Sequence, residues 1–277
     1  MRRAVWSQRG VGRVRTLAMP EFSTLRADVT DRIGRLTLTQ PRQLNPLGVV
    51  PLAEIAQAAA WFDTTDAVVV IVTGEGRAFS SGFDLREFAG QGENGVSPRE
   101  QADLGRLMAE AMERMSALSI AAIKGPCVGG GVVLAGVCDL RIAADDTVFS
   151  IPEVDLGIPL AWGGIPRLVR EIGPAITREL VLTCRPFHAE EARSIGFLNR
   201  VVPRSDLESA VDELATSIAN KAPSVVRATK RQVNVVLENM AATGGAWSDA
   251  DLLGAAMADP EAKEAARRYL ASRSRQT

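Results

Sequence analysis

The chain has 277 residues, with 32 lysines and arginines against 33 aspartates and glutamates, and its formal net charge is −1. Hydrophobic residues make up 46% and charged residues 23%, which is typical of a soluble globular protein of one large or two smaller domains. The near-zero charge argues against a dedicated nucleic-acid or membrane-surface binder, so we expect neither partner.

The first twenty residues hold five arginines and no acidic residue. Subtracting these five charges from the net charge of −1 leaves −6 on the remaining chain. The segment lacks the long apolar run of a secretory signal. A transit peptide and a translation start at Met19 both fit it, and we predict that residues 1–18 are a basic, disordered extension.

Histidine and cysteine are scarce in this sequence. His188 is the only histidine, which excludes a multi-histidine metal site within one chain and leaves one candidate for a Ser-His-Asp or Cys-His system. Cys127, Cys138 and Cys184 show no C-x-x-C spacing, so zinc or thioredoxin-type chemistry is unsupported. Their odd, small number is typical of a reducing compartment, so we expect a cytoplasmic protein without a metal site.

Hydrophobic periodicity predicts alternating strands and helices, and hence an α/β fold, up to about Pro159. The elements expected there are a hairpin of 25–29 and 33–39, a helix over 47–62, a buried strand over 67–73, a helix over 101–118, a buried strand over 120–124 and a buried helix over 131–137. The rest is predicted to be helical over 167–172, 175–183, 189–195, 205–220, 225–238 and 260–272, with one strand over 197–202.

Glycine-rich backbone follows buried strands in three segments, residues 78–88, 125–131 and 151–159. The triple glycine Gly129–Gly131 precedes an apolar helix, where free backbone N–H groups can bind phosphate or stabilise an oxyanion. It fits neither the G-x-G-x-x-G nor the P-loop pattern. By itself it is equally typical of close packing between a helix and a strand.

Together and in this order, the three segments resemble the crotonase family, also called the enoyl-CoA hydratase/isomerase family. Ala78–Leu85 resembles its A-F-x-x-G-x-D-[LI] motif, Gly125–Gly131 its G-x-x-x-G-G-G block, and Pro152–Gly157 its P-E-x-x-[LI]-G segment. The resemblance implies an α/β fold, a crotonase-like spiral of ββα units with an acyl-CoA site over residues 19–205. It also implies a helical C-terminal trimerisation region over 206–277, and a homotrimer or hexamer.

The resemblance also assigns roles to residues. The backbone N–H groups of Phe83 and Gly130 would bind the thioester oxygen of an acyl-CoA, and Glu153 would be the acid/base. No cofactor is implied, since coenzyme A is part of the substrate. The candidate substrate-binding residues are Arg42, Asn45, Ser81, Asp84, Leu85, Arg86, Val133 and Trp162. Arg42 and Asn45 belong to a loop that would line the adenine, and Arg86 would face the CoA phosphates. Asp84 would cap a helix that starts at Leu85, and Trp162 would shape the acyl cavity or pack in the core.

At two positions this sequence lacks a carboxylate that other enzymes of the family carry. Family hydratases carry a second glutamate where this chain has Val133, and dienoyl-CoA isomerases carry a carboxylate where it has Ala161. A lone Glu153 matches the Δ3-Δ2-enoyl-CoA isomerases, so isomerisation by one glutamate is the leading hypothesis. The alternatives are an acyl-CoA-binding homologue with little or no catalysis, and a hydratase whose second acid comes from elsewhere, such as Glu113.

Overall fold

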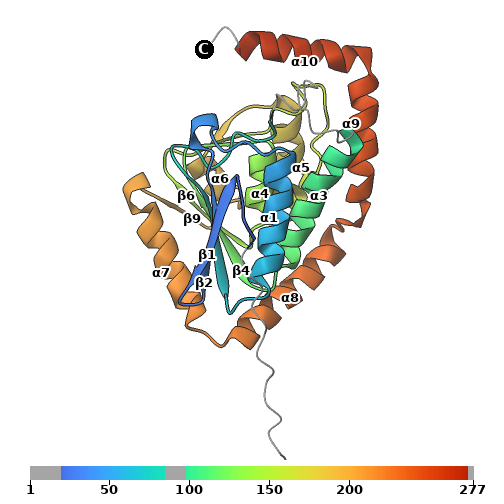
Figure 1. Ribbon diagram of the computed structural model, residues 1–277. Coiled ribbons are helices and arrows are strands. Elements are labelled where there is room, and N and C mark those ends of the chain that lie inside the picture. Colours follow the sequence, from blue (N-terminus) through green and yellow to red (C-terminus); the bar gives the residue numbers. More distant parts are fainter. Residues whose placement is uncertain (1–19, 85–97, 274–277) are drawn as a thin grey trace, which may run out of the picture.

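The computed structural model describes residues 20–84 and 98–273. Within these ranges the fold is the predicted mixed α/β structure, a mostly parallel sheet followed by a helical C-terminal region (Figure 1). The predicted N-terminal extension and the candidates Leu85 and Arg86 lie outside the described residues. None of the described helices is long and apolar enough to cross a bilayer.

The main sheet has six strands in the order β1-β2-β3-β4-β6-β9. Only β1 and β2 pair antiparallel, as the predicted hairpin, and every other neighbouring pair is parallel. The strands are β1 (Leu25–Thr30), β2 (Ile33–Leu38), β3 (Val69–Gly74), β4 (Leu118–Ile123), β6 (Leu140–Ala144) and β9 (Arg200–Val202).

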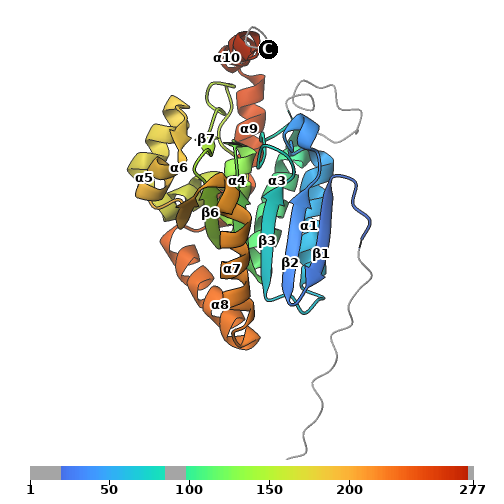
Figure 2. The ribbon, with the colours of Figure 1, turned by 90° about the vertical axis from the view of Figure 1, so that its left-hand side faces the viewer.

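Strand β3 lies near the middle of this sheet and is buried on both faces, as its β-branched run predicts. Val70 and Val72 belong to one apolar core, and Val69 and Ile71 belong to the other. Figure 2 shows helices on both faces of the sheet, with α7 (Leu207–Ala219) on one face and α1 (Val49–Phe62) and α3 (Pro98–Arg114) on the other.

A second, smaller sheet joins β5 (Pro126–Val128), β7 (Val148–Ser150) and β8 (Phe187–His188). Its register pairs Cys127 with Phe149 and Val128 with Ser150. Helix α4 (Gly130–Val137) starts directly after β5. This sheet therefore fixes both the start of α4 and the segment that follows β7.

The remaining helices of the described residues are α5 (Gly164–Thr183), α6 (Ala189–Ser194), α8 (Pro223–Met240), α9 (Asp249–Ala258) and α10 (Pro260–Arg273). Short 3-10 turns occur at Pro41–Gln43, Arg204–Asp206 and Gly244–Ser248. The two helices predicted at 167–172 and 175–183 form one kinked helix, because Gly173 has a non-helical φ of 75° ahead of Pro174. Several predicted bounds differ from the observed ones. Helix α3 ends at Arg114 because β4 begins at Leu118, and β9 begins only at Arg200.

Candidate active site

Two of the glycine-rich segments run side by side. Ser80 and Cys127 form a parallel β-bridge, and the Val128 N–H donates to the Ser80 carbonyl at 3.0 Å. On the other side of the first segment, Leu47 bridges to Phe83. Residues 80–83 are thus held between the start of α1 and the β5–α4 junction.

The absence of a side chain at Gly82 allows the two segments to approach this closely. A Cβ at Gly82 would stand 2.5 Å from the Val128 oxygen and 3.4 Å from the Gly130 nitrogen. Gly82 and Gly129 also have positive φ angles, 82° and 50°, which disfavour any other residue. The backbone nitrogens of Phe83 and Gly130 are therefore brought together at the start of α4.

Among the described residues, these two N–H groups have no hydrogen-bond partner. Neither the Phe83 N–H nor the Gly130 N–H donates a hydrogen bond to any residue within 20–84 or 98–273. Gly130 opens α4, where the partial positive charge of a helix N-terminus adds to the N–H dipole. Such a pair can donate hydrogen bonds to the oxygen of a thioester and stabilise it as an oxyanion.

Glu153 lies beside this pair. A Cβ at Gly129 would stand 3.2 Å from the Glu153 Cδ and closer still to its Oε1. The Oε2 atom is shielded from solvent and has no hydrogen-bond partner in the described structure. Burial raises the pKa of Glu153 to about 7, from an ordinary value of 4.5. The carboxylate is therefore poised to gain or lose a proton near neutrality.

Trp162 fills the space on the α3 side of Gly130. A Cβ at Gly130 would stand 2.7 Å from the Trp162 Cη2, and one at Gly105 of α3 would overlap the indole outright. The Phe83 ring meets this indole edge to face, with 6.1 Å between centroids. The two aromatic rings thus pack against each other beside the start of α4. Trp162 has a φ of 62° and is only 7% exposed.

A cavity of about 50 Å³ contains the carboxylate. Ser81, Phe83, Glu153 and Tyr269 are among the residues that line it. Sequence reasoning missed Leu156 and Ile158, which also line it and follow Glu153 closely enough for their spacing to have indicated it. It also left Tyr269 out of the site, since only tertiary structure brings α10 to this position.

The other candidates have varied surroundings. Val133 is buried in α4, close to the start of α5 at Gly164. Asn45 is a structural link, because its amide accepts from the Gln40 N–H and donates to two carbonyls, of Glu75 and Ala78. Arg42 is exposed. The Ser81 hydroxyl donates to the Gln43 carbonyl at 3.3 Å. The Asp84 N–H donates to the Leu47 carbonyl at 3.2 Å.

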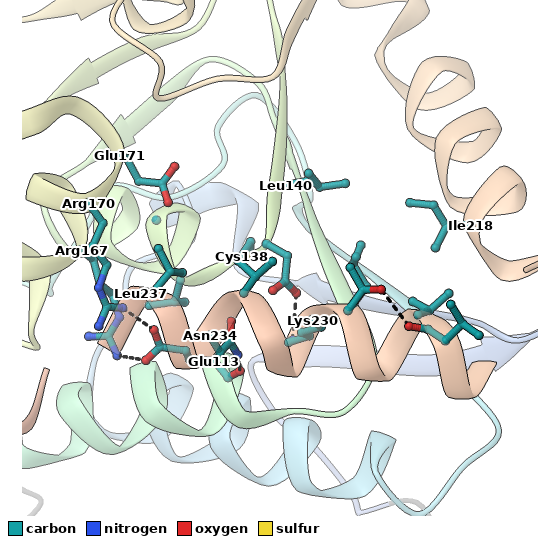
Figure 3. A pocket seen from close by; sticks show the side chains of 18 of the residues that line it. Glu113, Cys138, Leu140, Arg167, Arg170, Glu171, Ile218, Lys230, Asn234 and Leu237 are labelled. Carbon is teal, nitrogen blue, oxygen red and sulfur yellow. Dashed lines mark hydrogen bonds and ion pairs between the residues drawn. The ribbon is translucent and has the colours of Figure 1, made fainter. Parts of the chain in front are cut away.

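Glu113 does not line the Glu153 cavity. It lines a separate, largely apolar cavity of about 680 Å³ between α8 and the main body (Figure 3). There it pairs with Arg167 at 2.6 Å and Arg170 at 2.7 Å, both nearly fully buried. Glu113 therefore neutralises two buried guanidinium groups, and the structure does not bring it to Glu153 as a second acid.

No metal-binding cluster of three or more His, Cys, Asp or Glu side chains occurs among the described residues. His188 is exposed on β8, where it pairs with Val148 of β7. Burial raises the pKa of both Cys127 and Cys138, which disfavours a thiolate nucleophile at either position.

Comparison with known proteins identifies a family. The sequence profile of the enoyl-CoA hydratase/isomerase family matches residues 28–276. A probable enoyl-CoA hydratase of Mycobacterium bovis is 35% identical over 225 residues, 80% of this chain and 86% of that protein. A peroxisomal Δ(3,5)-Δ(2,4)-dienoyl-CoA isomerase of Arabidopsis thaliana is 32% identical, over 77% of this chain and 82% of its own length.

A solved structure extends the likeness to the fold. An enoyl-CoA hydratase/isomerase from Xanthobacter autotrophicus superposes with a TM-score of 0.79 at 30% identity, covering 90% of this chain and 94% of that one. Motifs, fold and relatives thus agree, and this chain belongs to the enoyl-CoA hydratase/isomerase (crotonase) family as an acyl-CoA-transforming enzyme.

Proposed function

We propose that the enzyme isomerises 3-enoyl-CoA to 2-enoyl-CoA, with Glu153 as its single acid/base and the N–H groups of Phe83 and Gly130 as its oxyanion hole. One observation carries the proposal. A buried carboxylate, whose Oε2 has no hydrogen-bond partner among the described residues, adjoins the N–H groups of Phe83 and Gly130, while the position of the hydratases' second glutamate is the hydrocarbon Val133.

The reaction needs no other group. The thioester oxygen accepts hydrogen bonds from Phe83 and Gly130 while Glu153 removes a proton from C2. The electrons of the broken C–H bond enter a dienolate that extends to the thioester oxygen. Protonated Glu153 then returns the proton at C4, and the double bond moves to C2–C3.

The environment of Glu153 supports both halves of this cycle. A base must be ionised to take the C2 proton, and the protonated carboxyl must be acidic enough to return the proton. A pKa of about 7 divides the carboxyl between these two forms at neutral pH. Valine at position 133 cannot hold or activate water, which favours internal proton return over hydration.

Hydration is the second candidate, since the Mycobacterium bovis relative is named a probable enoyl-CoA hydratase. It requires a second polar group to position water. Glu113 is engaged by two arginines, which argues against that source. The third candidate, acyl-CoA binding without turnover, would leave all substrates unchanged.

One assay separates the three candidates. The enzyme is incubated with 2-enoyl-, 3-enoyl- and dienoyl-CoA, and the products are resolved. Isomerisation predicts 2-enoyl-CoA from 3-enoyl-CoA with little 3-hydroxyacyl-CoA. Rapid 3-hydroxyacyl-CoA formation from 2-enoyl-CoA would establish the hydratase instead, and binding without any product would support the non-catalytic role.

The proposed assembly is a homotrimer or a hexamer of two trimers. Helix α8 supports it, because Val225, Val236 and Met240 are each more than half exposed. Such apolar side chains are commonly covered by a neighbouring subunit. Sedimentation analysis would give three or six chains per particle, and a monomer at micromolar concentration would contradict the assembly.

A further inference from the structure

The last helix packs directly on the segment that carries Glu153. Gly157 follows Glu153 by four residues, and a Cβ there would stand 2.8 Å from the Ala262 carbonyl carbon of α10. Figure 1 shows α10 crossing one end of the molecule. The backbone of α10 can therefore approach only because Gly157 has no side chain.

A second contact anchors the other end of the same segment. The Gly163 N–H donates to the Asp249 carboxylate at 2.8 Å, at the start of α9. Helix α9 leads into α10 with one intervening residue, Asp259. The C-terminal region thus contacts the segment after Glu153 at both Gly157 and Gly163.

Tyr269 is the side chain that α10 delivers to the site. Ala262, Ala265, Ala266 and Tyr269 are partly buried while the residues between them are exposed, a spacing that places these four on one face of the helix. Tyr269 lines the same small cavity as Glu153. The face that packs on Gly157 therefore ends, two turns later, in an aromatic residue that lines the cavity of Glu153.

We propose that Tyr269 closes the Glu153 cavity from this chain's own last helix and keeps water away from the carboxylate. The inference rests on the proposed function of Glu153 as acid/base. Tyr269 acts through Glu153 as a positioning residue, and the ring, rather than the phenol hydroxyl, provides the closure.

The closure has a measurable consequence for proton affinity. Burial is the main cause of the raised pKa of Glu153. Besides Tyr269, the titratable groups around it in the described structure are Cys184, which interacts with the Glu153 charge, and Asp155 next to Cys184. Neither group is a cation, so neither would offset the effect of hydration on the pKa of Glu153. Opening the cavity therefore lowers the pKa of Glu153 toward its ordinary value.

The test compares Tyr269→Ala and Tyr269→Phe, with Arg267→Ala as a control on the exposed face of α10. The readout is the pH dependence of kcat/KM for 3-enoyl-CoA. We expect wild type, Tyr269→Phe and Arg267→Ala to share an acidic limb near pH 7. We expect Tyr269→Ala to move that limb down by at least about one pH unit.

Two results would overturn the inference. One is an unshifted limb in Tyr269→Ala. The other is a Tyr269→Phe variant as altered as Tyr269→Ala, which would assign the effect to the hydroxyl. Carbon-13 NMR of labelled glutamate carboxyls reads the Glu153 titration without turnover. Failure of the proposed function is recognised separately, by a Glu153→Gln variant that retains full isomerase activity.

Discussion

The Glu153 carboxylate lies against the backbone of Gly129, with the Glu153 Cδ 3.2 Å from where a Gly129 Cβ would be. Gly129 immediately precedes Gly130, whose N–H is unpaired in the described structure. The absent side chain thus permits two things at once, the tight turn into α4 and the close approach of the carboxylate. The proposed acid/base and one proposed oxyanion donor are neighbours for this reason.

Activity should rise with pH through about 7. Glu153 must be ionised to take the C2 proton, and burial raises its pKa to about 7, so protonation at lower pH removes the base. The measurement is kcat/KM for 3-enoyl-CoA between pH 5 and 9. A single ionisation near pH 7 is expected, and a limb near pH 4.5, the ordinary glutamate value, would contradict the buried-base account.

Introducing a carboxylate at position 133 should create hydratase activity. In Val133→Glu, a second carboxylate would stand in α4 where the family's hydratases carry theirs, and it could hold and activate water. Formation of 3-hydroxyacyl-CoA from 2-enoyl-CoA should increase at least about tenfold. Because Val133 is 3% exposed, the variant should also lose about 1–3 kcal/mol of stability. Val133→Gln is the control of equal size.

The hydratase prediction has a clear contrary outcome. If Val133→Gln gained hydratase activity as fully as Val133→Glu, extra polarity rather than a second carboxylate would explain the change. If wild type already hydrated 2-enoyl-CoA faster than it isomerised 3-enoyl-CoA, the role given to Val133 would be wrong.

Shortening Trp162 should widen the range of acyl groups. The indole occupies the space between Gly105 and Gly130, so Trp162→Ala would open room beside the oxyanion donors. The ratio of kcat/KM for a ten-carbon over a four-carbon 3-enoyl-CoA should rise at least about tenfold. Trp61→Ala, which removes another buried indole, packed against Phe62 on α1, is the control. An equal rise there would show general loosening.

Neutralising Glu113 should cost stability rather than chemistry. Glu113→Gln leaves the Arg167 guanidinium buried without its carboxylate partner, which should cost about 3 kcal/mol in the free energy of unfolding. Glu110→Gln breaks more exposed pairs on the same helix and should cost less than about 1 kcal/mol. Activity per folded molecule should be unchanged in both. A large fall in activity per folded molecule in Glu113→Gln, without one in Glu110→Gln, would support Glu113 as the second acid.

The sequence predicted the parts of the fold that carry a strong local pattern. The β-branched run of β3 and the apolar helix after the triple glycine are such cases. It did not predict β5 or β8, because strands of three and two residues are too short to show a period. Helix α9 was also missed, since its residues 249–258 are weakly amphipathic and include Gly254.

The candidate site divides in the same way. Glu153, Phe83 and Gly130 could be selected because motif spacing marks each of them. Their proximity could not be read from the sequence, since it depends on backbone approach at Gly82 and Gly129. Tyr269 was not among the predicted site residues, because its place in the cavity depends on how α10 packs on Gly157.

The central claim is that one carboxylate performs the proton transfer, and Glu153→Gln tests it most directly. The amide keeps the size of the side chain but cannot take a proton from C2. Turnover of 3-enoyl-CoA to 2-enoyl-CoA should fall by about a thousandfold, while Glu190→Gln, on the exposed face of α6, should be unaffected. Equal rates for wild type and Glu153→Gln would contradict the account.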